Sequence, residues 1–199
     1  MNMNGIGDGM EGIRSFIAVE IPRDLHPPLQ SLQRELRNTA ADVKWVRPEG
    51  IHLTFKFLGD TVAERVPAVR EGVAAAASGI APFFLHTGAA GLFGPPSRPR
   101  VLWIGLDGER GAAERLASRI EDAMGGLGYP REARPFRPHL TLARFREGGG
   151  STIADADLES LTRAFEGIAF EVEELILFRS HLERGGAHYV PLASARLSG

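Results

Sequence analysis

Two stretches of the sequence decide how the chain folds: WVRPEGIHLTFKFLGD at Trp45–Asp60 and RPHLTLARF at Arg137–Phe145. Both contain the tripeptide His-Leu-Thr, at residues 52–54 in the first stretch and at residues 139–141 in the second. Polar and apolar side chains alternate through both tripeptides, which is typical of a strand with one buried face. The sequence therefore predicts two strands, each with a histidine and a threonine on one face and apolar side chains on the other.

The spacing of these motifs indicates a duplicated chain. His52 and His139 are 87 residues apart, and the turn sequence Gly-Ile-Ala at Gly79 recurs 88 residues later at Gly167. Stable solenoid arrays generally need about three repeats, whereas only two copies occur in this sequence. We therefore expect an α+β fold of two pseudo-symmetric lobes, each with a mostly antiparallel sheet and outer helices, around a central cleft.

The remaining apolar periodicities agree with this arrangement. Residues 1–12 carry no apolar period and are expected to form a loose leader, and residues 13–199 are expected to form a single bilobal domain. Strands are predicted at 14–21, 43–59 (interrupted at 48–50), 83–92, 100–106, 138–145, 169–178 and 188–192, and helices at 24–38, 63–77, 110–124 and 153–165.

Composition excludes several classes of site. The chain has no cysteine, which rules out disulfides, thiolate metal sites and cysteine nucleophiles. Its 23 basic and 25 acidic side chains give a formal charge of −2, so any phosphate recognition must be local. No apolar run approaches the roughly 18 residues that span a bilayer, and there is no secretory signal pattern, so we expect a cytoplasmic protein without membrane contact.

The two histidines suit phosphodiester chemistry. Imidazole has an unperturbed pKa near 6.5 and can give or take a proton near neutral pH, so two imidazoles make an acid and a base. Hydrolysis of a cyclic phosphate needs a base to activate water, an acid to protonate the departing oxygen, and donors for the non-bridging oxygens. We expect His52 and His139 to be the acid–base pair and Thr54 and Thr141 to be the donors.

Two basic residues follow the motifs. Lys56 has the same strand parity as His52, so a regular strand would direct its ammonium group into the cleft, towards the phosphate. Arg144 follows the second motif, but strict alternation from His139 turns it away from the cleft unless a β-bulge intervenes. Both are candidate substrate-binding residues.

Two aromatic residues flank the first motif. Trp45 and Phe57 could stack on a nucleobase, since aromatic rings commonly do so in nucleic-acid binding proteins. Both lie in apolar strands, however, and we expect them to pack in the core.

The sequence closely resembles the two-histidine (2H) phosphoesterases, and among them the LigT-like RNA 2′,3′-cyclic phosphodiesterases, once called RNA 2′-5′ ligases. The resemblance runs from FIAVEIP at residues 16–22 through both His-Leu-Thr stretches to the final strands. It implies a bilobal fold with a cleft tetrad that works without a metal or other cofactor. By the same analogy, His52 is the proton donor to the leaving ribose oxygen and His139 is the proton acceptor from water, although the near-symmetry of the motifs leaves these roles unassigned by chemistry alone.

The expected substrates are RNA ends with a 2′,3′-cyclic phosphate, or small cyclic nucleotides, hydrolysed to a 2′-phosphomonoester by a monomeric enzyme. Other functions remain compatible with the sequence. The chain could be a 2H enzyme acting on another cyclic nucleotide phosphate or in 2′-5′ RNA ligation, or an RNA-end binding module without turnover. A metal hydrolase is less favoured, because neither motif offers acidic ligands or the histidine spacing of a metal site.

Overall fold

The computed structural model describes residues 12–36, 43–95, 97–146, 153–183 and 186–199. The predicted leader therefore lies outside the described residues except for Gly12. Among the described residues, none of the helices combines the length and apolar character needed to span a bilayer.

Strands and helices alternate along most of the chain, as the periodicities predict. The strands are β1 (Ile13–Glu20), β2 (Val43–Trp45), β3 (His52–Thr61), β4 (Phe83–Phe93), β5 (Val101–Gly108), β6 (His139–Phe145), β7 (Ala169–Val172), β8 (Glu174–Glu183) and β9 (Gly186–Arg196). The helices are α1 (His26–Leu36), α2 (Val66–Ala77), α3 (Arg110–Gly126) and α4 (Asp155–Phe165), with 3₁₀ turns η1 (Arg23–Leu25), η2 (Pro48–Gly50) and η3 (Ala63–Arg65).

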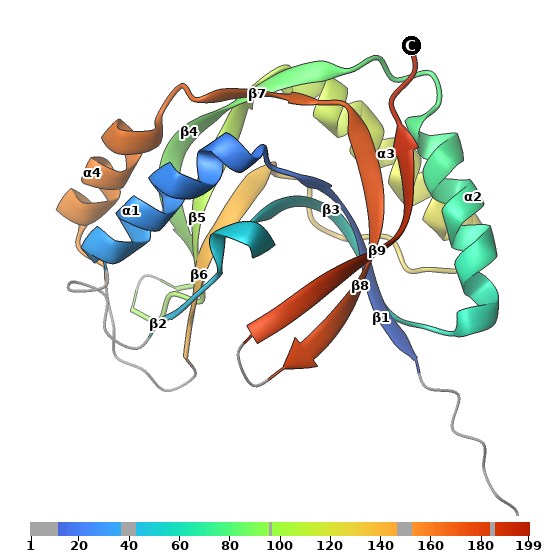
Figure 1. Ribbon diagram of the computed structural model, residues 1–199, viewed down its shortest axis with the longest axis horizontal. Coiled ribbons are helices and arrows are strands. Elements are labelled where there is room, and N and C mark those ends of the chain that lie inside the picture. The colour runs from blue at the N-terminus through green and yellow to red at the C-terminus, as the bar shows by residue number, and fades with distance from the viewer. Residues whose placement is uncertain (1–11, 37–42, 96, 147–152, 184–185) are drawn as a thin grey trace, which may run out of the picture.

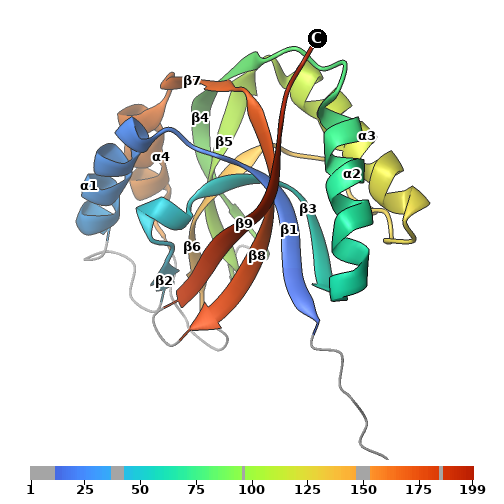
Figure 2. The same ribbon diagram turned by 45° about the vertical axis from the view of Figure 1, so that its right-hand side comes forward.

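The described strands form one nine-stranded sheet in the order β7-β4-β5-β6-β3-β1-β8-β9, with β2 attached to β6. Each recorded strand pair is antiparallel. The sheet is strongly curved, with α1 and α4 together on one side of the arc and α2 and α3 together on the other (Figures 1 and 2). The expected α+β architecture is confirmed, although the two lobes share one continuous sheet.

The middle of the sheet lies between the two motif strands, β3 and β6, where the recorded pairing is the single register pair Leu53–Leu140. From this point β6, β5 and β4 follow on one side, and β3, β1 and β8 on the other. Strand β4, from the first half of the chain, thus lies beside β5 from the second, and β8 from the second half lies beside β1 from the first. The spatial lobes therefore exchange strands between the two halves of the sequence.

Apolar side chains fill both faces of the central strands. In β1, Ile17 and Val19 join the main core, whereas Phe16 and Ala18 belong to a second, smaller cluster on the opposite face. The main core also takes up the apolar stripe of α3, whose buried residues recur at the three- and four-residue spacing of an amphipathic helix. Because β1 is buried on both faces, its sequence is a continuous apolar run rather than an alternation.

The predicted strand at 169–178 is wrong in one respect, because it is two strands. β7 pairs with β4 at one end of the sheet order, whereas β8 begins two residues later and pairs with β1. The change of partner occurs at Glu173, and the apolar pattern continues through it on both sides. Local periodicity cannot reveal such a change, since it is set by which distant strands are available.

Candidate active site

The two His-Leu-Thr motifs meet at the centre of the sheet. Leu53 and Leu140 are paired and completely buried in the main core. Their neighbours in sequence point to the opposite face, where His52, Thr54, His139 and Thr141 are all partly accessible. Continuing the antiparallel register places each histidine across from the threonine of the other motif. The structure thus brings the predicted tetrad together on one face.

Both imidazoles are held by a hydrogen bond to the backbone carbonyl of the residue two positions earlier in the chain. Nδ1 of His52 lies 2.8 Å from the carbonyl oxygen of Gly50, and Nδ1 of His139 lies 2.7 Å from that of Arg137. A carbonyl oxygen can only accept, so Nδ1 carries the hydrogen in both rings. In the neutral ring Nε2 is then the acceptor, and each histidine is ready to take a proton at Nε2 or, once protonated, to donate one.

The surroundings of the pair favour neutral imidazoles in the free protein. Burial lowers the pKa of His52 to about 4, while the bond to Gly50 raises it and the charges of Arg144 and His139 lower it further. Burial likewise lowers the pKa of His139, with the bond to Arg137 opposing and the charge of Arg144 reinforcing the shift. The charge of His139 makes the smallest of these contributions to the lowered pKa of His52.

Aromatic side chains surround both histidines, and the sequence analysis missed them as site residues. His52 stacks on Phe16 with ring centroids 4.8 Å apart and meets Tyr189 edge-on at 5.1 Å. His139 meets Phe93 edge-on at 4.9 Å. Trp103 packs beside His139 at 6.3 Å and lies 87 residues after Phe16, so the repeat offset could have identified this pair. The rings provide the burial that lowers the pKa values of the histidines.

A β-bulge follows each motif. In β3, Ala18 of β1 pairs with Thr54 whereas Ile17 pairs with Lys56, so Phe55 is an extra residue. In β6, Trp103 of β5 pairs with Thr141 whereas Leu102 pairs with Ala143, so Leu142 is extra. The two extra residues are again 87 positions apart. A bulge moves the side chains that follow it to the opposite face of the sheet. It therefore decides on which face Lys56 and Arg144 lie.

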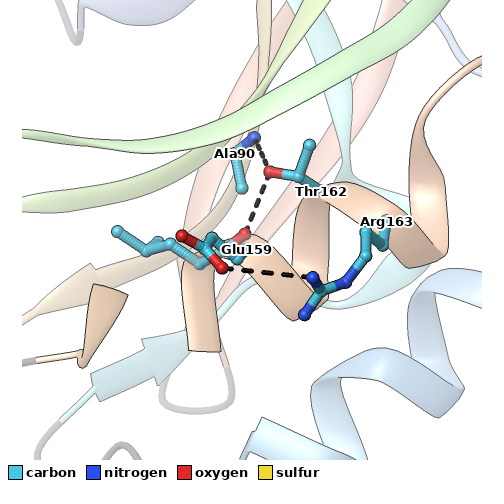
Figure 3. A pocket seen from close by; sticks show the side chains of 5 residues that line it. Ala90, Glu159, Thr162 and Arg163 are labelled. Atoms are coloured by element: carbon cyan, nitrogen blue, oxygen red, sulfur yellow. Dashed lines mark hydrogen bonds and ion pairs between the residues drawn. The ribbon is translucent and has the colours of Figure 1, made fainter. Parts of the chain in front are cut away.

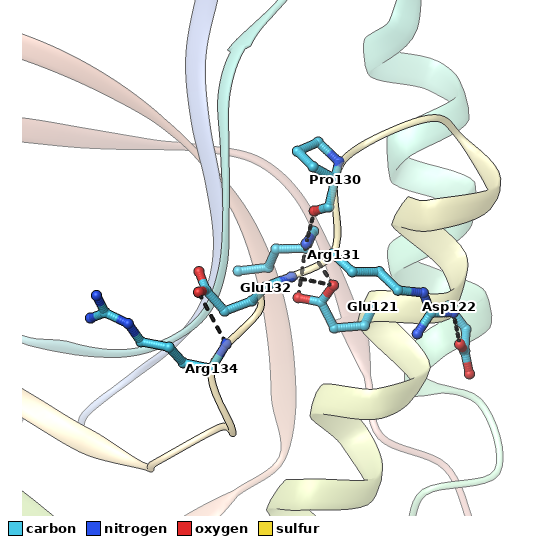
Figure 4. A network of polar contacts seen from close by, with 7 residues as sticks. Glu121, Asp122, Pro130, Arg131, Glu132 and Arg134 are labelled. Carbon is cyan, nitrogen blue, oxygen red and sulfur yellow. Dashed lines mark hydrogen bonds and ion pairs between the residues drawn. The ribbon is translucent and has the colours of Figure 1, made fainter.

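The prediction that Lys56 points into the cleft is wrong. Its side chain is only 6% exposed, and its Nζ lies 2.8 Å from both carboxylate oxygens of Glu121 on α3 and 2.8 Å from the carbonyl oxygen of Pro130. Figure 4 shows Glu121 and Pro130 close together, and both accept hydrogen bonds from the Lys56 ammonium group. The bulge turns Lys56 to the helix-covered face, where it joins β3 to α3 and to the loop that leads to the second motif.

The bulge in β6 brings Arg144 to the face of the sheet that carries the histidines. Arg144 is exposed, and its positive charge lowers the pKa of His52 and of His139. It also opposes the rise that burial causes in the pKa of Tyr189. The exposed Lys44 of β2 pairs directly with Arg144. The sequence analysis expected Arg144 to point towards the histidines only if a bulge intervened. That bulge is present at Leu142.

Two other features of the described residues lie apart from the tetrad. A hollow of about 370 Å³ between α4 and β4 is lined by Ala90, Leu158, Glu159, Thr162 and Arg163. There the Thr162 hydroxyl accepts a hydrogen bond from the Ala90 backbone and ties the helix to the strand (Figure 3). Within the described ranges, no three or more His, Cys, Asp or Glu side chains are grouped closely enough to hold a metal ion.

Comparison with known proteins gives the family. The family model described as LigT like Phosphoesterase matches this chain twice, at residues 19–103 and 104–189. The chain belongs to the LigT-like phosphoesterases. The two matches divide this phosphoesterase into consecutive halves, each of which contains one His-Leu-Thr motif.

Curated relatives of this LigT-like phosphoesterase include RNA 2′,3′-cyclic phosphodiesterases of several organisms. The RNA 2′,3′-cyclic phosphodiesterase of Aeropyrum pernix is 32% identical over 82% of this chain and 92% of its own length. That of Geobacillus stearothermophilus is 32% identical over 85% of this chain, which spans only about half (52%) of that relative.

Solved structures share the fold. A protein of Thermus thermophilus superposes with a TM-score of 0.78 at 28% identity, covering 94% of this chain and 99% of that one. Escherichia coli LigT, crystallised with 3′-AMP, superposes with a TM-score of 0.72 at 26% identity, covering 95% of this chain and all of that one. The 2H phosphoesterase assignment and the LigT-like fold are confirmed.

Proposed function

We propose that this enzyme hydrolyses the terminal 2′,3′-cyclic phosphate of RNA to a 2′-phosphomonoester, with His52 and His139 as the proton donor and acceptor. The observation that carries the proposal is the matched pair of imidazoles, each with Nδ1–H bound to a backbone carbonyl and Nε2 left for proton transfer. The names of the curated relatives support the substrate class. The 3′-AMP bound to Escherichia coli LigT supports a nucleotide-sized ligand.

The proposed reaction needs one protonated and one neutral imidazole. Nε2 of His139 takes a proton from water as the water oxygen bonds to phosphorus. The P–O3′ bond breaks, and the departing O3′ receives the proton held on Nε2 of His52. The product has a 2′-phosphate and a 3′-hydroxyl, and the pair returns to its starting state after exchanging one proton with solvent.

The phosphoryl group is proposed to lie between the two motifs. The hydroxyls of Thr54 and Thr141 share the face of the histidines and are assigned as donors to the non-bridging oxygens. Arg144 is assigned as the cation that binds the phosphate, because its charge already acts on both histidines. Lys56 has no part in this proposal, since it is bound to Glu121.

A short RNA with a 2′,3′-cyclic phosphate tests this function directly. The wild-type protein, dialysed against EDTA, is expected to convert the cyclic phosphate to a 2′-phosphomonoester, identified by ³¹P NMR. Loss of turnover on chelation that a single added metal restores would overturn the metal-independent mechanism, and a 3′-phosphate product would overturn the bond assignment. Binding of the RNA without turnover would instead identify an RNA-end binding module.

We also propose that the enzyme is a monomer that acts in the cytoplasm. Sedimentation equilibrium tests the first point and cell fractionation the second. A concentration-independent mass other than 21.5 kDa would contradict the monomer.

A further inference from the structure

A second cation lies beside Arg144 on the face of the histidines. Lys44 of β2 and Arg144 of β6 are directly paired, and directly paired residues in a sheet point to the same face. The next pair along these strands is Trp45 with Ala143, of which Ala143 belongs to the main core and Trp45 packs against it, as expected. Because side chains alternate between faces, Lys44 and Arg144 point away from that core, and both are exposed.

The two motifs differ in the side chains that follow them. Phe57 lies five residues after His52, and Arg144 lies five residues after His139. The bulge in β3 leaves Phe57 63% exposed, so the expectation that it packs in the core is wrong. At the equivalent place after the second motif the exposed side chain is a cation, and Lys44 adds another beside it. Two positive charges therefore lie next to each other beside the second motif.

These two charges have no recorded carboxylate partner among the described residues. The ion pairs recorded there are Lys56–Glu121, Arg110–Asp107, Arg131–Asp122 and Arg163–Glu159. Like charges directly opposite each other on two strands repel, so the pairing of Lys44 with Arg144 is unfavourable until an anion binds between or beside them.

The repeat shows that this position is not neutralised in the same way in both halves. Arg131 stands 87 residues after Lys44, and the dipeptide Arg-Pro at 47–48 recurs at 134–135 with the same offset. Arg131 is bound to Asp122 of α3 (Figure 4). Of the two equivalent cations, Lys44 is thus the one whose charge is left for a ligand within the described part of the chain.

The proposed substrate supplies two anions at adjacent positions. Arg144 is already assigned to the cyclic phosphate. In RNA the next phosphate is the 5′-phosphodiester of the terminal nucleotide, which a single ribose separates from the cyclic phosphate. Adjacent cations on the enzyme therefore match adjacent phosphates on the substrate. A lysine ammonium is a compact charge on a flexible stem, which suits contact with a phosphodiester oxygen without demanding one fixed geometry.

We propose that Lys44 binds the phosphodiester that joins the terminal nucleotide to the rest of the RNA. This contact gives the enzyme a preference for RNA ends over free cyclic nucleotides, which lack that phosphate. The inference rests on the proposed function, and it concerns a contact away from the reacting atoms.

The test compares two substrates that differ only in this phosphodiester. They are adenosine 2′,3′-cyclic phosphate and the same compound with a methyl phosphate ester at its 5′ oxygen, and kcat/KM is measured for both. The wild type should favour the ester. In Lys44→Gln the ratio of the two values should fall about fivefold, the upper end of what an exposed ion pair contributes, and the fall should appear mainly in KM. Lys44→Arg, which keeps the charge, should retain most of the wild-type ratio.

Salt provides a second readout of the same contact. Because dissolved ions screen exposed charges, the wild-type ratio should fall as NaCl is raised, whereas the ratio of Lys44→Gln should change little. A merely structural role for Lys44 would leave both ratios with the same salt dependence, and would contradict the proposal.

Arg70→Gln is the matched control. It removes one positive charge from an exposed position on α2, whose apolar side packs into the main core. This variant should keep the wild-type ratio. An unchanged ratio in Lys44→Gln, including equal losses on both substrates, or an equal fall in Arg70→Gln, would overturn the phosphodiester site alone. Failure of the wild type to hydrolyse either compound would remove the proposed function, and this inference with it.

Discussion

His52 is neutral near pH 7 in the free protein, because burial lowers its pKa to about 4. As the proposed donor it must be protonated when the substrate reacts. Binding of the anionic phosphate should raise the pKa of His52 and so favour its protonation. A negative charge near an imidazole favours the charged form and offsets the effect of Arg144. The two histidines are thus set for a substrate that carries a negative charge.

This protonation equilibrium predicts an acid-shifted rate profile. The reactive form holds one proton on the pair, and both pKa values are lowered from 6.5. In the free enzyme that form is lost as pH rises through the upper pKa of the pair, so the bell-shaped profile of kcat/KM should have its maximum below pH 6.5. The limbs of kcat, which report the complex, should lie at higher pH. Profiles from pH 3.5 to 9 test this, and a maximum of kcat/KM above pH 7 would contradict it.

Arg144→Gln should move the same profile. Arg144 lowers the pKa of both histidines, so its loss raises both values and shifts both limbs of kcat/KM to higher pH. Loss of a phosphate-binding cation should also raise KM. Arg163→Gln, which removes an exposed arginine on α4, is the control and should change neither. Unmoved limbs in Arg144→Gln would show that Arg144 does not act on the pair.

A sulfur leaving group separates the roles of the two histidines. A thiol is a far stronger acid than a ribose hydroxyl. In a 2′,3′-cyclic substrate with sulfur at the 3′ position, the 3′ sulfur can therefore leave as a thiolate without a proton donor. His52→Ala should hydrolyse this substrate nearly as fast as the wild type does, whereas His139→Ala should stay impaired, as both variants should on the oxygen substrate. Rescue of His139→Ala in place of His52→Ala would show that the two roles are reversed.

At the scale of elements, the two bulges decide what sequence can predict. Alternation placed His52 and Thr54 correctly because both precede the bulge at Phe55. It misplaced Lys56 and Phe57, which follow it, since nothing in a local period reveals an extra residue. The two consecutive apolar residues before Arg144, Leu142 and Ala143 at the matching position of β6, are a signal in the sequence that could have indicated a bulge.

The link between β3 and α3 should be a major contributor to stability. Lys56→Met leaves the Glu121 carboxylate, itself largely buried, without its cation, and breaking a buried pair costs about 3–5 kcal/mol. The double variant Lys56→Met/Glu121→Met removes both charges and should recover most of that loss. Urea unfolding of the three proteins gives the free energies of unfolding.

The exposed Arg163–Glu159 pair on α4 is the control for this experiment. Arg163→Ala should change the free energy of unfolding by at most about 1 kcal/mol, as is usual for surface pairs. An equally small loss in Lys56→Met would show that the buried pair does not hold the helix to the strand.

At the scale of the whole molecule, the duplicated halves are interleaved. The repeat was visible in the sequence because His-Leu-Thr, which carries the proposed chemistry, stands at both positions. The exchange of strands was not visible, because it depends on pairings between segments far apart in the chain: β4 with β5, and β8 with β1. Each lobe consequently needs both halves of the sequence.

Neither half should fold alone. A fragment of residues 1–98 lacks β5, β6 and β8, the partners of β4, β3 and β1, and so leaves buried strands unpaired on both sides of the centre. Circular dichroism and amide exchange of fragments 1–98 and 99–199 should show little protected structure in either one, with sheet structure recovered on mixing. Cooperative unfolding of an isolated half would contradict the interleaved arrangement.

The account depends on His52 and His139 acting as one acid–base unit, and a comparison of single and double variants tests this most directly. Turnover of a short RNA with a 2′,3′-cyclic phosphate is measured for the wild type, His52→Ala, His139→Ala and the double variant, each verified as folded. Each single variant should lose about 10²–10⁴-fold in kcat, and the double variant should be scarcely worse than either, because groups that act as a unit are strongly non-additive. Losses that multiply in the double variant would show that the two histidines act independently, and would contradict the central claim.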